Sequence, residues 1–282
     1  MTALRIPTRS VRTTGAAAYW LAAALVTVSQ IAAIMTFVEP GILTGPAAMN
    51  GSARGTALVV GVFAVPVLVV GAVMSARGSV RGVVLWLGGS AYLTYNAVMF
   101  LFATPFNQLF LLYVAMLSLS LWTIGVVLWT WWPAELGTSR LPRRAIALYM
   151  WVTVALNLLA WLRVIVPATL ADRPTAFLDG TGLTTNPVYV QDLAIWLPLA
   201  TAAAVGLWYR RPLWTLIAGA VLTMWVLESI SIAADQAFAD AADPGSSVAS
   251  SSAVWMFAVL AIIGLIPLVG FLVRSGDQHR VA

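Results

Sequence analysis

Two long apolar segments joined by one short polar turn constrain the fold of this chain more than any other feature. Residues 83–103 and 108–131 contain no Asp, Glu, Lys or Arg, and Thr104–Asn107 lies between them. Each segment is long enough to cross the ~30 Å hydrocarbon core of a bilayer as an α-helix. So short a turn returns the chain to the membrane face that it has just reached. The two segments therefore predict a transmembrane helical hairpin.

The composition of the whole chain supports the same class of protein. Hydrophobic residues make up 61% of the 282 residues and charged residues only 9%, whereas a soluble domain carries about 25% charged residues. Six further apolar segments have spanning length. The sequence therefore predicts an all-α, polytopic membrane helical bundle that forms one domain over residues 1–282. Its eight transmembrane helices are expected at residues 16–38, 56–75, 83–103, 108–131, 145–168, 190–208, 213–235 and 253–273.

The arginines predict the orientation of the bundle. Eight spans place both termini on one side, and cytoplasmic loops of membrane proteins are enriched in Arg and Lys. The chain has no Lys, and with a cytoplasmic N-terminus only Arg54 and Arg173 lie outside, while Arg163 lies within a span. We therefore expect a multi-pass protein of the cytoplasmic membrane with both termini in the cytoplasm and the lipid bilayer as its partner. The cytoplasmic arginines are then Arg5, Arg9, Arg12, Arg77, Arg81, Arg140, Arg143, Arg144, Arg210, Arg211, Arg274 and Arg280.

Missing residue types exclude several chemistries. The chain has no Cys and no Lys, and its one His, His279, lies near the C-terminus. This composition excludes thiolate nucleophiles, iron–sulfur clusters, bis-His haem, His-based zinc sites, Ser-His-Asp catalysis and Schiff bases to Lys. No glycine-rich nucleotide motif is present either. We therefore expect no metal and no cofactor. We also expect no nucleic-acid partner, because the basic charge reports membrane orientation.

Polar side chains within the spans fall near one depth. At about 1.5 Å per residue from the inner end of each span, four of them lie about 18 to 22 Å deep and Arg163 about 27 Å deep. Tyr113 comes near the same level from the outer side, and Asp192 lies at the outer edge of its span. The inner halves of the spans are almost wholly apolar. The candidate ligand-binding residues are Glu228, Arg163, Asn96, Asp192, Tyr113, Asn157 and Gln30.

Glu228 is the residue of this set whose burial in hydrocarbon is the most costly in free energy. An ionised carboxylate in hydrocarbon costs several kcal/mol unless it is paired or protonated. Arg163 is the one cation within the predicted spans, so we expect an ion pair between the two side chains. Two alternatives stay open: the pair can be a structural clamp, or Arg163 can extend into the headgroup layer. Asn96, Asn157 and Gln30 can equally serve as interhelical hydrogen-bonding groups.

Two motifs resemble those of a family of uncharacterised multispanning membrane proteins in bacteria and archaea. The first comprises Tyr95–Phe100, Pro105–Asn107 and Leu109–Tyr113, and the second is Thr181–Leu193. The resemblance implies a multispanning fold and suggests that the hairpin turn and the Thr-Asn-Pro segment belong together. It implies no activity.

Three functional hypotheses follow from the sequence. The favoured one is an outward-facing polar pocket in the outer-leaflet half of the bundle, which binds or transports a small or amphiphilic molecule. The second is an enzyme that acts on a lipid-borne substrate, with Glu228 and Asp192 as acid and base. The third is a structural or assembly subunit whose polar layer serves only packing. Catalytic residues, the identity of the ligand and the oligomeric state stay open.

Overall fold

Eight helical segments of membrane length confirm the predicted all-α bundle. The computed structural model describes residues 15–39, 41–131, 136–137 and 141–277. Each of the eight segments is long and apolar enough to cross a bilayer. They are Ala16–Val38, Ala47–Ala76, Val80–Phe102, Phe110–Thr130, Arg143–Thr169, Pro187–Trp208, Pro212–Ala242 and Ser251–Arg274.

Six of these spans are single α-helices and two are interrupted by a wider turn. The single helices are α1 (Ala16–Val38), α4 (Val80–Phe102), α5 (Phe110–Thr130), α6 (Arg143–Thr169), α9 (Pro212–Ala242) and α10 (Ser251–Arg274). The second span consists of α2 (Ala47–Val59), the π-helix η1 (Val60–Ala64) and α3 (Val65–Ala76). The sixth consists of α7 (Pro187–Gln191), the π-helix η3 (Asp192–Trp196) and α8 (Leu197–Trp208). A 3₁₀ turn, η2 (Pro174–Leu178), and a two-residue antiparallel pair, β1 (Leu136–Gly137) with β2 (Gly276–Asp277), complete the described elements.

Both π-helical segments are explained by a proline that follows them. Pro66 is the second residue of α3, and Pro198 is the second residue of α8. A proline has no N–H to donate, and its ring collides with the carbonyl four residues earlier. That carbonyl lies inside the π-helix in both spans, where the wider turn relieves the collision. The second of these segments begins at Asp192, so the irregular backbone also sets the position of this carboxylate.

Two of the helical segments extend well beyond the predicted spans. The second span was expected to begin at residue 56 but begins at Ala47, and the seventh was expected to end at residue 235 but continues to Ala242. The added turns of α2 and α9 pack on each other. A Cβ on Gly55 would lie 2.5 Å from the carbonyl oxygen of Ala234. The added turns of α9 are rich in alanine, which favours a helix, whereas those of α2 contain Asn50, Gly51 and Gly55, and their close packing on α9 favours the helical conformation there.

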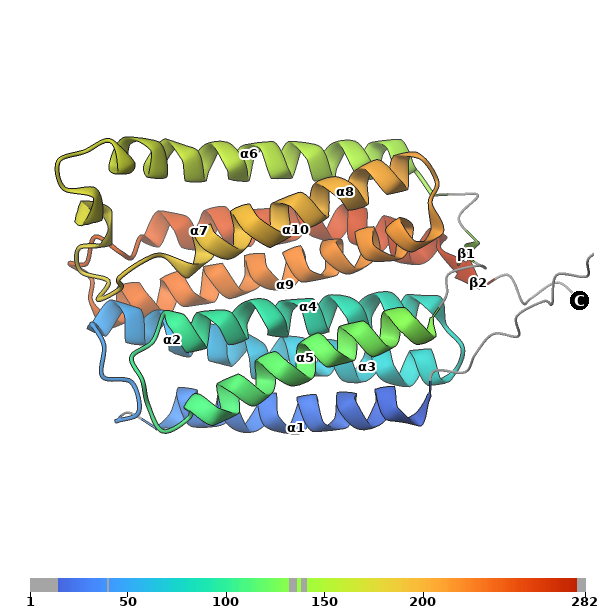
Figure 1. Ribbon diagram of the computed structural model, residues 1–282, viewed down its shortest axis with the longest axis horizontal. Coiled ribbons are helices and arrows are strands. Elements are labelled where there is room, and N and C mark those ends of the chain that lie inside the picture. Colours follow the sequence, from blue (N-terminus) through green and yellow to red (C-terminus); the bar gives the residue numbers. More distant parts are fainter. Residues whose placement is uncertain (1–14, 40, 132–135, 138–140, 278–282) are drawn as a thin grey trace, which may run out of the picture.

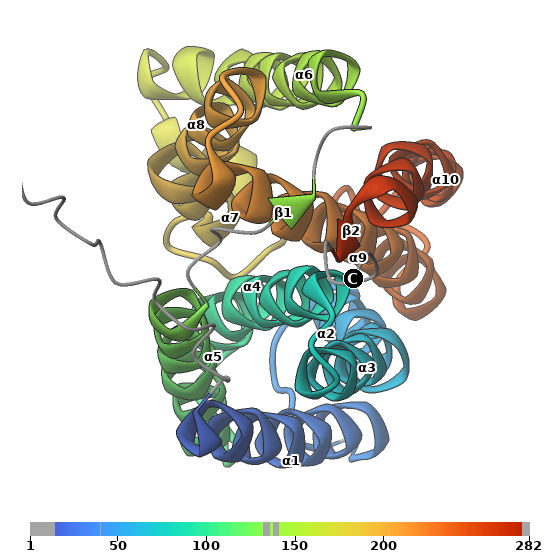
Figure 2. The ribbon, with the colours of Figure 1, turned by 90° about the vertical axis from the view of Figure 1, so that its right-hand side faces the viewer.

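Helices α4 and α9 lie side by side in the middle of the bundle, with α1, α3 and α5 on one side and α6, α8 and α10 on the other (Figure 2). Helix α1 begins, and α10 ends, at the same end of the molecule (Figure 1). We call this the inner end and the opposite one the outer end. The α4–α5 hairpin turns at the outer end, as the sequence predicted.

The described arginines are concentrated at the inner end. Arg54, Arg163 and Arg173 belong to the outer half, while the predicted cytoplasmic positions Arg5, Arg9, Arg12, Arg140 and Arg280 lie outside the described residues. The arginines at the inner end are Arg77, Arg81, Arg143, Arg144, Arg210, Arg211 and Arg274.

Candidate functional site

A cluster of polar side chains joins α4 and α9 at the centre of the bundle. The Asn96 amide donates one hydrogen bond to Glu228 Oε2 (3.0 Å) and one to the Tyr92 carbonyl oxygen (3.2 Å). The Tyr92 hydroxyl donates to Ser231 Oγ (2.9 Å). Tyr92, Asn96 and Ser231 are buried, whereas Glu228 is partly buried. We call these four residues the central polar cluster.

Asp192 lies beside this cluster, at the start of η3. Its Oδ2 accepts a hydrogen bond from the Trp161 indole N–H on α6 (2.8 Å), and its carboxylate interacts with Tyr95 on α4. Asp192 is only 8% exposed. Glu228 and Asp235 are seven residues apart on α9 and so share one face of that helix. The outer half of the bundle thus contains three carboxyl groups within its helices, Asp192 on η3 and Glu228 and Asp235 on α9.

The predicted ion pair between Arg163 and Glu228 is wrong. Within the described residues the one ion pair joins Arg173 to Asp179 (2.7 Å), and both of these side chains are exposed at the outer end. Arg163 is exposed on the face of α6 that also carries the exposed Leu156 and Leu159. Because α6 packs mainly on α8, this face points away from the centre. The structure therefore favours the alternative in which the long side chain extends toward the membrane surface.

The remaining candidates lie at other helix interfaces. The Tyr113 hydroxyl shares a hydrogen bond of 2.8 Å with Thr36 Oγ1 on α1, and its ring stacks on Phe100. The Gln30 amide packs on η1, where a Cβ on Gly61 would lie 3.2 Å from its Nε2. Asn157 is partly buried on α6 and has no hydrogen-bond partner among the residues that the structure describes. Residues of similar depth are thus distributed around the bundle, and the structure brings only Asn96 and Glu228 into direct contact.

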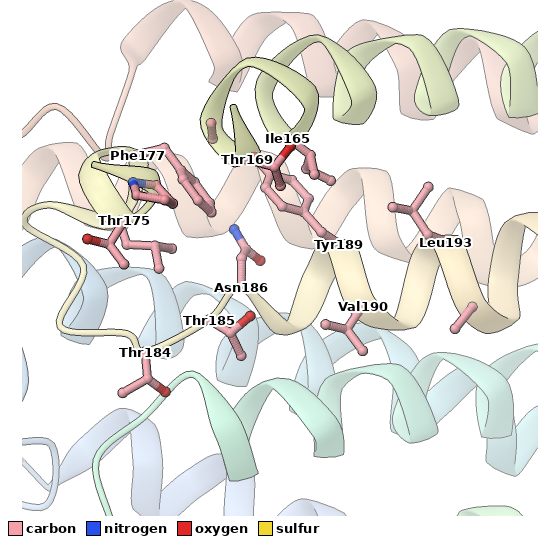
Figure 3. Close-up of a pocket in the computed structure, with 14 residues that line it drawn as sticks. Ile165, Thr169, Thr175, Phe177, Thr184, Thr185, Asn186, Tyr189, Val190 and Leu193 are labelled. Atoms are coloured by element: carbon pink, nitrogen blue, oxygen red, sulfur yellow. The ribbon is translucent and has the colours of Figure 1, made fainter. Parts of the chain in front are cut away.

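A pocket opens at the outer end between α6, η2 and the α7–η3 segment (Figure 3). Its volume is about 570 Å³. None of its lining residues is charged, and none was among the candidate ligand-binding residues named from the sequence. We call it the outer pocket. It is lined by Ile165, Ala168, Thr169, Pro174, Thr175, Phe177, Leu178, Thr184, Thr185, Asn186, Tyr189, Val190, Leu193 and Ala194.

Most polar groups of the outer pocket lie near its mouth, and its inner part is apolar. Helix α6 runs outward, so Thr169 is nearer the outer surface than Ile165. The α7–η3 segment runs inward, so Asn186 lies near the surface and Leu193 lies deeper. Figure 3 shows this gradient from Thr184 and Asn186 to Leu193. Hydroxyl and amide groups therefore lie at the entrance beside the apolar Pro174, Phe177 and Leu178 of η2, and aliphatic side chains surround the inner part.

One aromatic wall connects the outer pocket with Asp192. The Tyr189 ring packs on Trp161, with 4.9 Å between ring centroids, and on Phe177, with 6.0 Å. Trp161 in turn holds Asp192 through its indole N–H. Tyr189 is thus linked through Trp161 to a buried carboxylate.

The Asn186–Pro187 pair is the sequence signal that positions this wall. The Asn186 Oδ1 accepts a hydrogen bond from the Val188 N–H (2.9 Å) and so caps α7, where Pro187 occupies the first turn. This cap fixes the start of the helix that carries Tyr189.

The two motif segments approach neighbouring residues of the α1–α2 connection. A Cβ on Gly45 would lie 3.3 Å from Pro105 in the first motif, and a Cβ on Gly182 in the second motif would lie 3.3 Å from Pro46. Asn107 caps its own turn, because its Oδ1 accepts from the Leu109 N–H (2.9 Å). One part of each motif therefore meets the α1–α2 connection at the outer end.

Comparisons with protein-family models, with curated proteins and with solved structures gave no match for this chain.

Proposed function

We propose that this protein binds an uncharged amphiphilic molecule in the outer pocket and acts as a binding or transport protein of the cytoplasmic membrane. The polarity gradient of the pocket is the observation that carries this proposal. Thr185 and Asn186 offer hydrogen bonds to a polar head, and Ile165 and Leu193 offer an apolar surface to a tail. A volume of about 570 Å³ falls within the range of small-molecule sites.

The absence of charge in the pocket lining decides the class of ligand. An anionic or cationic head would leave the headgroup layer for a site that provides no counter-ion, at a large cost in free energy. A tail gains little on transfer from lipid to protein, because both surroundings are apolar. Selectivity therefore comes from the hydroxyl and amide groups at the mouth, which favour a neutral head that both donates and accepts hydrogen bonds.

The proposed orientation places the pocket mouth at the outer leaflet. The concentration of arginine at the inner end supports a cytoplasmic position for that end. Because the chain contains no Cys, single-cysteine variants report the orientation directly. We expect a membrane-impermeant maleimide to label Ser247→Cys, at an exposed outer site, in intact cells. Ala76→Cys, exposed at the inner end, should react only after permeabilisation, and the reverse pattern would contradict the orientation.

A blocking variant tests the pocket. Leu193→Trp adds a large ring to the inner wall of the pocket and is expected to weaken binding of a fluorescent diacylglycerol by roughly tenfold or more, about 1.4 kcal/mol. Binding is measured by fluorescence titration of the purified protein in detergent. Ile195→Trp is the matched control, since Ile195 lies two residues away in the same π-helix and is 55% exposed toward lipid.

Two results would contradict the proposal. Equal affinities of the Leu193→Trp variant and the unchanged protein would place the diacylglycerol elsewhere. A stronger preference for a fluorescent phosphatidylglycerol, which is anionic, would contradict the choice of an uncharged ligand.

A further inference from the structure

Glu228 is a carboxyl group at the centre of the bundle with no cation beside it. It lies about 24 Å from the inner end of α9, counted at 1.5 Å per residue. The one ion pair in the described part of the chain lies elsewhere, between Arg173 and Asp179. A carboxylate at such a depth is strongly unfavourable, whereas the neutral acid is tolerated. The surroundings of Glu228 therefore decide whether its side chain is the neutral acid or the carboxylate.

The groups around Glu228 supply hydrogen bonds but no positive charge. Asn96 on α4 donates a hydrogen bond to Glu228. The other titratable groups on this side of the bundle are Tyr92 and Tyr95 on α4, Asp192 on η3 and Asp235 farther out on α9. Asn96 donates both amide hydrogens, one to Glu228 and one to the Tyr92 carbonyl. This arrangement suits a carboxylic acid, in which one oxygen accepts from Asn96 and the other carries the proton.

The same surroundings do not suit a metal ion. No group of three His, Cys, Asp or Glu side chains within the described residues could hold one. Asn96 directs its N–H toward Glu228, whereas a cation requires oxygen atoms. A proton is therefore the ligand that this site fits.

Polar groups continue from Glu228 toward the outer end along α9. Ser231 follows three residues later and accepts the hydroxyl hydrogen of Tyr92. Asp235 follows seven residues after Glu228, about 10 Å farther along the helix. The Asp235 Oδ1 is buried and has no hydrogen-bond partner in the described part of the protein. Buried polar atoms of this kind are commonly satisfied by water.

We propose that Glu228 is a proton-binding site that exchanges one proton with the outer face by way of Ser231, Tyr92 and Asp235. A hydronium ion at the outer face gives its proton to Asp235, and the proton then passes through water and the two hydroxyls to a Glu228 oxygen. An O–H bond forms on Glu228 and a water molecule is left at the surface, so no oxidant or reductant takes part. Release follows the reverse path. The proposal does not depend on a ligand in the outer pocket.

Infrared difference spectroscopy tests the proton site. Purified protein in lipid nanodiscs is titrated from acidic to alkaline pH, and the carbonyl-stretch band of protonated carboxylic acids is followed in H₂O and D₂O. We expect a deuterium-sensitive band that is lost as the pH rises and that is absent from Glu228→Gln. Glu39→Gln, at the exposed end of α1, is the matched control and should keep the band.

Two further variants keep the test decisive if Glu228→Gln does not fold. Asn96→Leu removes the hydrogen bond to Glu228 Oε2 and should shift the frequency of the same band. Asp235→Asn should keep the band but slow its response to a pH jump by about tenfold or more. The proposal is overturned by an unshifted band in Asn96→Leu, by an unchanged rate in Asp235→Asn, or by a response to sodium instead of pH.

Discussion

Replacing Gly55 with Ile is expected to destabilise the bundle by about 3 kcal/mol or more, beyond the usual cost of overpacking. A Cβ on Gly55 would lie 2.5 Å from the Ala234 carbonyl oxygen and 2.6 Å from the Asp235 Cα. These are backbone atoms, so no side chain can rotate to make room. The helices α2 and α9 would have to separate, which removes packing along both. The free energy of unfolding in mixed detergent micelles measures the loss.

A matched substitution separates this effect from the general cost of a β-branched residue in a helix. Gly125 on α5 and Gly270 on α10 each have open space where a Cβ would be built. We expect Gly125→Ile and Gly270→Ile to change the free energy of unfolding by less than about 1 kcal/mol. A Gly55→Ile variant as stable as these two would mean that α2 and α9 are not in close contact.

The eight spans could be predicted from sequence because hydrocarbon imposes one strong requirement on the chain. Each span must satisfy its backbone internally and present apolar side chains over about 20 residues. The first helix, Ala16–Val38, was predicted at the same boundaries. The outer turns of α2 and α9 could not be predicted by this criterion. In α2, for example, Gly51 and Gly55 are of a residue type that is common in loops. Their four-residue spacing is nevertheless a signal for close helix packing.

The polar residues at the centre were found because they interrupt apolar spans, but their partners depend on packing. Depth along a helix follows from residue counting, whereas the direction of a side chain around the bundle depends on which helices are neighbours. Helix α6 packs on α8 and α1 packs on α5. Arg163 is consequently exposed, and Tyr113 bonds to Thr36.

The outer pocket had no distinct signal in the sequence. Ile165 and Leu193 are ordinary apolar residues of transmembrane spans, and only their packing around η2 makes them pocket walls. Leu193 and Ala194 belong to the π-helix before Pro198, so the widened turn positions part of one wall. Pro198 was visible in the sequence, but a proline alone does not distinguish a kink from a widened turn.

A double-mutant cycle between Asn96 and Glu228 should give a coupling energy of 0.5–3 kcal/mol, the range typical of residues in one hydrogen-bond network. Asn96→Leu leaves a Glu228 oxygen without its donor, and Glu228→Leu leaves an Asn96 hydrogen without its acceptor. Each single change should cost about 1–3 kcal/mol. The double variant replaces both partners with apolar side chains and should be more stable than the sum of the single effects predicts.

The same cycle between Arg163 and Glu228 distinguishes this structure from the ion pair that the sequence suggested. Arg163→Gln and Glu228→Leu should be additive to within about 0.5 kcal/mol, because side chains without a shared partner act independently. Arg163 is exposed on the outer face of α6, while the hydrogen-bond donor to Glu228 is Asn96 at 3.0 Å. A coupling larger for Arg163 than for Asn96 would show that α6 turns this face toward α9. Glu228 would then be held as a carboxylate beside a guanidinium group, and its proton would no longer be exchangeable.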